Sequence, residues 1–304
     1  MTEQEIVHHY SAEADRGGIW RHARAVTAYP MVAWHHRGLV WNFARRELLG
    51  RFRGSLLGVF WVMVQPLFLF AIYYLVFGYL FGGGRASGEL GSGAPSAEFA
   101  LYLFSGVTML LAFNEGTSRA CTVVVDNGNL VKKVAFPSEL LPLHPILVAL
   151  AVYVVATLMM IVGGLALGGL QLDAMFAFWP LVLAIQFLLT LGVGLVLAQL
   201  YVFSRDLSHL WGIAAQTLMF VTPVFWQRSL IESTPGNVEG PMVLFLWNPL
   251  YSMLAAQRQV LGLGATVHEP FAQNVTIAAA WALFFLAVGF GMFTSRRHKF
   301  ADLV

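Results

Sequence analysis

The sequence has few charged residues and almost no cysteine. Charged side chains make up 11% of the 304 residues, and Cys121 is the single cysteine. One cysteine excludes an internal disulfide framework. With 58% hydrophobic residues and a mean hydropathy of +0.69, the chain is too apolar for a soluble globular domain. The scarcity of charge therefore predicts a protein that lies largely within a membrane.

Residue patterns typical of enzymes are also missing. The nine histidines are scattered and give no Cys/His spacing for a metal. No Gly-x-x-x-x-Gly-Lys-Ser/Thr phosphate loop occurs, because none of the three lysines follows a glycine. The glycines at positions 163, 164, 192 and 194 are expected to allow close helix packing instead. If the protein uses ATP hydrolysis, another chain must supply it.

Six apolar segments are candidates for crossing a bilayer, whose core takes about 20 apolar residues to span. They are residues 56–81, 99–125, 140–167, 176–203, 209–226 and 271–294. The first lies within residues 54–84, a stretch without any charge. The pattern predicts an all-α polytopic membrane protein with six transmembrane helices.

The positions of Lys and Arg predict the orientation, because these residues stay on the cytoplasmic side. With six spans and both termini inside, only Arg85, Arg228 and Arg258 fall outside, while Arg119 lies within a span. Residues 240–257 are also free of charge, but two prolines interrupt them. We expect outer re-entrant short helices there, between spans five and six, where protein covers the broken backbone.

A basic segment precedes the first span. Residues 29–52 are expected to form an N-terminal amphipathic helix at the membrane interface. Glu47 and Arg51 are four residues apart with the acid first, which favours a helical ion pair. Glu115 and Arg119 repeat this spacing inside the second span, where charge is costly. The second pair has two interpretations, a local ion pair or a polar patch beside a transport path.

Three stretches resemble the membrane subunits of ABC polysaccharide exporters, which transport O-antigen, capsular polysaccharide or teichoic acid. They are residues 46–67, with Arg-Glu-Leu, Arg-Phe-Arg-Gly-Ser and Gln-Pro-Leu; residues 129–142, with Asn-Leu-Val-Lys-Lys and Phe-Pro; and residues 205–226, with Arg-Asp-Leu and Thr-Pro-Val-Phe-Trp. The resemblance extends from about Val40 to the C-terminus. Phe52 departs from the pattern, because the family usually has tyrosine there.

The resemblance implies a permease subunit that exports lipid-linked polysaccharide, foremost O-antigen, across the bacterial inner membrane. Residues 1–53 would form a cytoplasmic segment with a membrane-surface helix, and residues 54–304 a six-span permease domain with both termini cytoplasmic. It also implies a homodimer around one channel, contact with membrane lipid, and two copies of an ABC ATPase subunit that carry the ATP and Mg²⁺. No cofactor in this chain and no nucleic acid partner are expected.

In this family the surface helix and one cytoplasmic loop contact the ATPase. The candidate coupling residues are therefore Arg46, Glu47, Arg51, Arg53, Lys132, Lys133, Phe136 and Pro137. The two lysines have a simpler interpretation as ordinary cytoplasmic-side charges. An apolar ring followed by proline in a polar loop suits a groove on a partner protein.

Aromatic residues make up 14% of the chain. Candidates for lining the channel are Tyr73, Tyr74, Phe225 and Trp226, at the outer parts of spans one and five, because sugar rings stack on aromatic faces. The residues alone favour an interfacial belt or core packing, whereas the resemblance implies aromatic residues along the channel.

Two other functions stay open: an ABC exporter of a small molecule or lipid, and a membrane-embedded enzyme or scaffold of envelope biosynthesis. The lack of paired in-membrane carboxylates or histidines argues against the enzyme.

Overall fold

The computed structural model describes residues 29, 31–76, 97–133, 138–226, 247–264, 267, 269–296 and 300–303. These residues form helices and no strand, which confirms the predicted all-α fold class. Five helical segments among them are long and apolar enough to cross a membrane. They are Gly58–Val76, Phe99–Asp126, Ser138–Ala166, Ala174–Phe203 and Phe271–Phe293.

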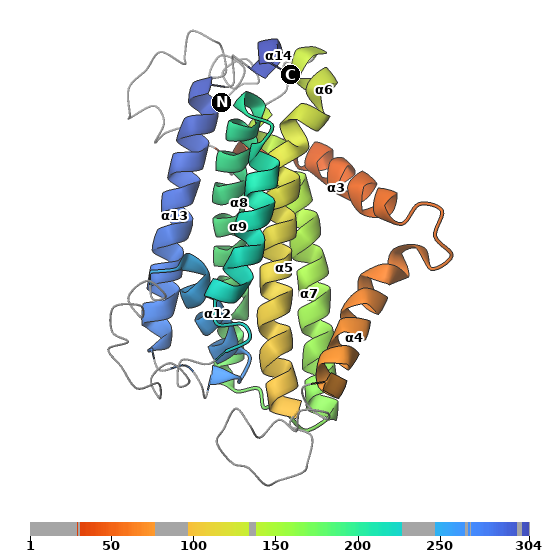
Figure 1. Ribbon diagram of the computed structural model, residues 1–304, viewed down its shortest axis with the longest axis vertical. Coiled ribbons are helices and arrows are strands. Elements are labelled where there is room, and N and C mark those ends of the chain that lie inside the picture. The colour runs from red at the N-terminus through yellow and green to blue at the C-terminus, as the bar shows by residue number, and fades with distance from the viewer. Residues whose placement is uncertain are drawn as a thin grey trace.

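The long helices α5 (Ala97–Asp126), α7 (Leu143–Ala166), α8 (Trp179–Phe203) and α13 (Phe271–Arg296) run along one another in a bundle (Figure 1). The 3₁₀ turns η5 (Ser138–Leu140) and η6 (Ala174–Phe178) precede α7 and α8. Close packing of α8 on α13 depends on glycine, because a Cβ atom added to Gly289 would lie 2.5 Å from the Gly192 carbonyl oxygen. A Cβ atom added to Gly192 would in turn lie 2.5 Å from the backbone carbonyl carbon of Phe285 on α13, which confirms the predicted packing role of Gly192.

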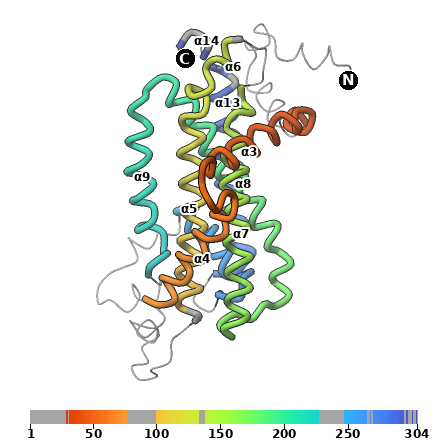
Figure 2. Tube along the Cα trace, turned by 90° about the vertical axis from the view of Figure 1, so that its right-hand side faces the viewer, coloured from red at the N-terminus to blue at the C-terminus, as the bar shows by residue number. Residues whose placement is uncertain are grey.

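The helix α9 (Leu207–Val221) lies at the edge of the bundle (Figure 2) and corresponds to the predicted fifth span. It ends five residues earlier than predicted, because Thr222 is extended and Pro223 follows it. Its 15 residues give a length of about 22 Å, against a hydrocarbon core of about 30 Å. The number of six spans therefore stays a prediction.

The helices α3 (Arg37–Arg51) and α4 (Trp61–Tyr73) form an elbow on one side of the bundle (Figure 1). The turn η2 (Gly58–Phe60) leads from one to the other, and α4 returns to pack on α7. Residues 31–35 are also helical, so most of the predicted N-terminal helix is present, with a turn at His36, while its place at the membrane interface stays a prediction. The α3 helix buries only Val40 and Ala44, which lie one turn apart on a single face.

Short helices lie at both ends of the bundle. At one end α6 (Gly128–Lys133) follows α5 after a break at Asn127, and α14 (Phe300–Leu303) packs beside α6. In the other half of the molecule α12 (Pro249–Val260) packs against α13, α8 and α5 (Figure 1). A short helix at this place fits the predicted outer segment, although residues 240–246 lie outside the described ones.

Candidate functional site

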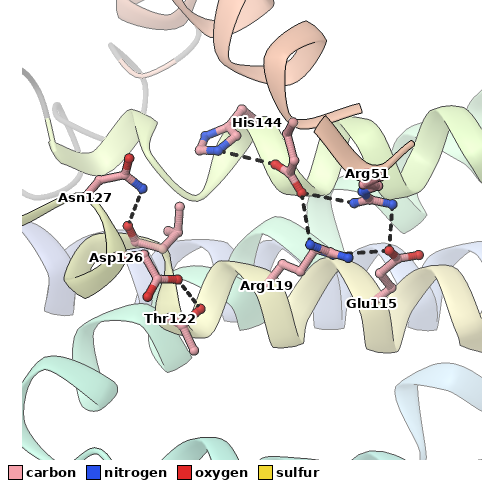
Figure 3. A network of polar contacts seen from close by, with 9 residues as sticks. Arg51, Glu115, Arg119, Thr122, Asp126, Asn127 and His144 are labelled. Atoms are coloured by element: carbon pink, nitrogen blue, oxygen red, sulfur yellow. Dashed lines mark hydrogen bonds and ion pairs between the residues drawn. The ribbon is translucent and has the colours of Figure 1, made fainter. Parts of the chain in front are cut away.

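Charged and polar side chains from three helices meet where α3 joins the bundle (Figure 3). Glu47 and Arg51 come from α3, Glu115 and Arg119 from α5, and His144 from the first turn of α7. We call these five residues the α3 network. Its two arginines and two glutamates balance in charge.

Glu47 connects the three helices. Its Oε1 accepts a hydrogen bond from Arg51 Nη2 at 3.0 Å and lies 3.6 Å from Arg119 Nη1. Its Oε2 lies 3.3 Å from His144 Nε2. The Glu47 side chain is only 17% exposed, so these partners replace most of the water around its carboxylate.

Glu115 makes the second set of contacts. Its Oε1 accepts hydrogen bonds from Arg51 Nη1 at 2.7 Å and from Arg119 Nε at 3.2 Å. Arg51 thus bridges a carboxylate on its own helix and one on α5. Because both arginines contact both acids, α3 cannot shift along α5 without separating several ion pairs together.

The sequence predicted part of this arrangement. The ion pairs Glu47–Arg51 and Glu115–Arg119 are both present, as their four-residue spacing indicated. The joining of the two pairs and the contribution of His144 were missed. Phe43 on α3 faces the His144 ring with 5.4 Å between ring centroids, and this long-range packing leaves no periodic signal in the sequence.

A cavity of about 250 Å³ lies beside the α3 network. Residues of α3, α5 and the start of α7 line it, including Arg46, Glu47, Arg119, Asp126 and His144. Arg46 is exposed, and its guanidinium lies 5.1 Å from the centre of the Phe43 ring. Because both basic and acidic side chains line the cavity, it can accommodate polar groups of either charge.

The predicted coupling residues fall into three groups. Glu47 and Arg51 belong to the α3 network, Arg46 lines the adjacent cavity, and Arg53 is exposed just beyond α3. Lys132 and Lys133 lie on α6, so the expectation that they occupy a loop was wrong; the six-residue helix resumes directly after Asn127. Phe136 and Pro137 lie outside the described residues.

The four predicted channel residues have different surroundings. Tyr73 packs against the hydrophobic core, and Tyr74 stacks on Phe70 with ring centroids 6.4 Å apart. Phe225 is 36% exposed, with its ring 6.0 Å from that of Phe220. The Trp226 indole donates a hydrogen bond to the Phe220 carbonyl oxygen at 2.9 Å. The predicted role of these rings in lining a channel stays a prediction.

Much of the apolar surface of α4 and α9 is uncovered. Among their described residues α4 buries only Pro66, and α9 buries only Ala215. Phe68 on α4 is 67% exposed, and Ile213 and Phe220 on α9 are 66% and 70% exposed. In a membrane protein such a surface faces lipid or another protein chain.

Comparison with known proteins gives a consistent result. A model of the family "ABC-2 type transporter" matches residues 38–262. An O-antigen export system permease protein, RfbA of Myxococcus xanthus, is 26% identical over 272 residues, which cover 89% of this chain and 97% of that protein. Two proteins of the same name from Klebsiella pneumoniae are 22% and 21% identical, each over 85% of this chain and 92% of its own length.

Proposed function

This chain belongs to the ABC-2 type transporter family, and we propose that it is the permease subunit of an ATP-driven exporter of lipid-linked polysaccharide, with O-antigen as the substrate. The observation that carries the substrate is the similarity to three O-antigen export permeases along nearly their whole length. The five long apolar helices support a place in the membrane. We place the protein in the bacterial inner membrane, with both termini cytoplasmic.

The energy comes from a separate subunit in this proposal. The sequence lacks a phosphate loop, so two copies of an ABC ATPase bind the ATP and Mg²⁺. The ATPase docks at the end of the bundle that carries α3, α6 and the cavity beside the α3 network. Arg46, Arg53, Lys132, Lys133, Phe136 and Pro137 serve as the docking residues.

The α3 network then transmits the movement of the ATPase. A force on α3 reaches α5 through Arg51 and Arg119, and reaches α7 through the contact of Glu47 with His144. Partly buried ion pairs suit this task because separating them is costly, so the helices move together.

A second copy of the chain completes the export path. The uncovered apolar surfaces of α4 and α9 support a homodimer in which these helices meet their counterparts, with lipid around the rest. Tyr73, Tyr74, Phe225 and Trp226 line the path in this arrangement. Their rings offer the apolar faces on which sugars stack.

The aromatic residues can be tested by replacement at Trp226. We expect Trp226→Ala to reduce polysaccharide export per assembled complex several-fold, while Trp226→Phe largely preserves export because stacking needs only an aromatic face. Export is measured as surface polysaccharide divided by the amount of complex in the membrane. If the loss in the alanine variant follows a loss of complex, the ring has a packing role instead.

Deletion of the gene tests the function as a whole. Cells without this chain should lack the surface polysaccharide and accumulate its lipid-linked form on the cytoplasmic side, and a plasmid copy should restore export. The purified complex should contain two copies of this chain and two of an ABC ATPase, by mass measurement. Unchanged surface polysaccharide in the deletion strain would contradict the proposal.

A further inference from the structure

A second group of polar contacts lies in the opposite half of the molecule, around Arg258 of α12. The Arg258 residue is only 3% exposed. Its Nη1 donates a hydrogen bond to the Pro223 carbonyl oxygen at 2.8 Å, and its Nη2 donates to those of Tyr102 at 3.2 Å and Val224 at 3.4 Å. Among the described residues no carboxylate forms a salt bridge with Arg258. The acceptors of this buried cation are main-chain carbonyl groups.

These carbonyl groups belong largely to the break after α9. The chain leaves the helix at Thr222, so the carbonyl groups of Pro223 and Val224 no longer face the amides of a following turn. Away from water an unpaired carbonyl group is costly. The planar guanidinium of arginine carries several donors in a fixed fork, which lets one side chain satisfy carbonyl groups on two segments.

Neighbouring residues hold the same segment. The guanidinium carbon of Arg258 lies 3.4 Å from the centre of the Tyr102 ring. The Tyr102 hydroxyl shares its single proton between two carbonyl oxygens, that of Trp226 at 2.9 Å and that of Pro223 at 3.3 Å. Asn248, the N-cap of α12, donates from its side-chain amide to Thr222 Oγ1 at 3.1 Å. The segment Thr222–Trp226 is thus tied to both α5 and α12.

We propose that Arg258 is a positioning residue, which fixes the segment Thr222–Trp226 and with it the Phe225 and Trp226 rings at the outer end of the export path. The statement that the segment lies at the end of an export path rests on the proposed function. The restraint of the segment by Arg258 rests on the contacts described above. It follows that α12 and the outer end of α9 move as one unit. A change that frees the segment should disturb passage of substrate more than it disturbs assembly.

The restraint can be measured without substrate. Cys121→Ala removes the native cysteine, and Val224→Cys then places a thiol at a position that is fully buried in the protein. In the complex with its ATPase, this thiol should react slowly with a membrane-impermeant maleimide added from outside. Arg258→Met should speed the reaction about tenfold, since a segment that loses its hydrogen bonds opens more often. Arg258→Lys should do nearly the same, because an ammonium group cannot reproduce the fork.

Gln257→Met provides the matched control. Gln257 lies beside Arg258 on α12, is fully buried and donates a hydrogen bond to the Ser105 carbonyl oxygen of α5, whereas among the described residues no hydrogen bond joins it to the segment Thr222–Trp226. Its replacement should leave the labelling rate of the Val224→Cys thiol within about twofold of the parent. If Arg258→Met does not assemble, Tyr102→Phe tests the same restraint, because it removes only the hydroxyl that holds Trp226 and Pro223.

Export per ATP hydrolysed supplies the functional measurement. With native Val224 restored, Arg258→Lys and Tyr102→Phe should keep ATP turnover and complex abundance but export several-fold less polysaccharide per ATP. Unchanged labelling in the Arg258 and Tyr102 variants would overturn the proposal, and so would faster labelling with normal export per ATP. If the wild-type complex exports no polysaccharide, the proposed function fails, while the labelling still decides whether Arg258 holds the segment.

Discussion

Glu47 has more polar partners than any other residue of the α3 network, because it forms ion pairs with Arg51 and Arg119 and also contacts His144. Each partner comes from a different helix, so one carboxylate sets the relative positions of α3, α5 and α7. A charge this far from water is stable only while it is paired. We therefore expect changes at Glu47 to affect folding and, if the proposed function holds, coupling as well.

Glu47→Gln should destabilise the complex and weaken coupling. The change removes the charge that balances Arg51 and Arg119, and losing a hydrogen-bonded ionic contact of this kind costs about 2 kcal/mol. We expect a lower thermal unfolding temperature of the solubilised complex and less polysaccharide exported per ATP.

Arg45→Gln is the control for this substitution. Arg45 is exposed on the same helix, two residues before Glu47, and lies outside the α3 network. Its replacement should change stability by no more than about 0.5 kcal/mol. Equal stability and coupling in the two variants would mean that the α3 network contributes neither to stability nor to coupling.

The sequence predicted the individual pairs at this scale but not their assembly. Spacing along one helix fixes which side chains share a face, so Glu47–Arg51 and Glu115–Arg119 could be recognised in advance. The contact of Arg51 with Glu115 spans 64 residues and depends on how α3 crosses α5. The contacts of Arg258 with the break after α9 are equally non-local, and its predicted place outside the spans gave no sign of its burial.

At the scale of elements, the apolar segments and their order were predictable, whereas their ends depended on local chemistry. The predicted span over residues 271–294 agrees with α13, because these residues include no charged side chain and no proline. The α9 helix ends earlier than the predicted fifth span, since a residue before proline disfavours the helical conformation and Thr222 is extended. The helical placement of Lys132 was missed because Asn and Gly, the residues at positions 127 and 128, are typical of turns and give no sign that a helix follows at once.

The contact between α8 and α13 gives a matched pair of glycine substitutions. Gly289→Ala should destabilise the protein by about 1–3 kcal/mol, because the new methyl group meets the Gly192 carbonyl oxygen and forces the helices apart. Gly291→Ala, two residues later on the same helix, places its methyl group in open space and should be nearly neutral. Thermal unfolding of the two variants in detergent checks the difference. Equal loss in both would show that the effect at Gly289 does not come from its packing on α8.

At the scale of the whole molecule, α5 connects the two polar clusters. Tyr102 near one end contacts Arg258 of α12, and Glu115 contacts Arg51 of α3. The two positions are 13 residues apart, which corresponds to about 20 Å along the helix. A shift of α5 driven from the α3 network would reach the segment Thr222–Trp226 directly. In the proposed function we therefore expect α5 to link ATP use to the outer end of the path.

The orientation of the molecule can be tested with single cysteines at exposed positions. In a Cys121→Ala background, a cysteine at Ala174 should react with an impermeant thiol reagent added outside, since η6 lies on the predicted outer side. Cysteines at Ser204 and Ser295 should react only after the cells are opened, because the α8–α9 turn and the end of α13 are predicted to be cytoplasmic. Labelling of Ser295→Cys from outside would mean that an odd number of spans separates Ser295 from the predicted cytoplasmic N-terminus.

The central claim, that this chain forms the export path while a separate ATPase supplies the energy, is tested most directly by reconstitution. The purified chain, with or without its ABC ATPase, is placed in vesicles that carry the lipid-linked polysaccharide, and passage to the opposite leaflet is followed by an impermeant glycan-binding probe. We predict ATP-dependent passage only when both chains are present, and no ATP hydrolysis by this chain alone. Passage or hydrolysis without the ATPase would contradict the claim, as would the absence of passage with both chains and ATP.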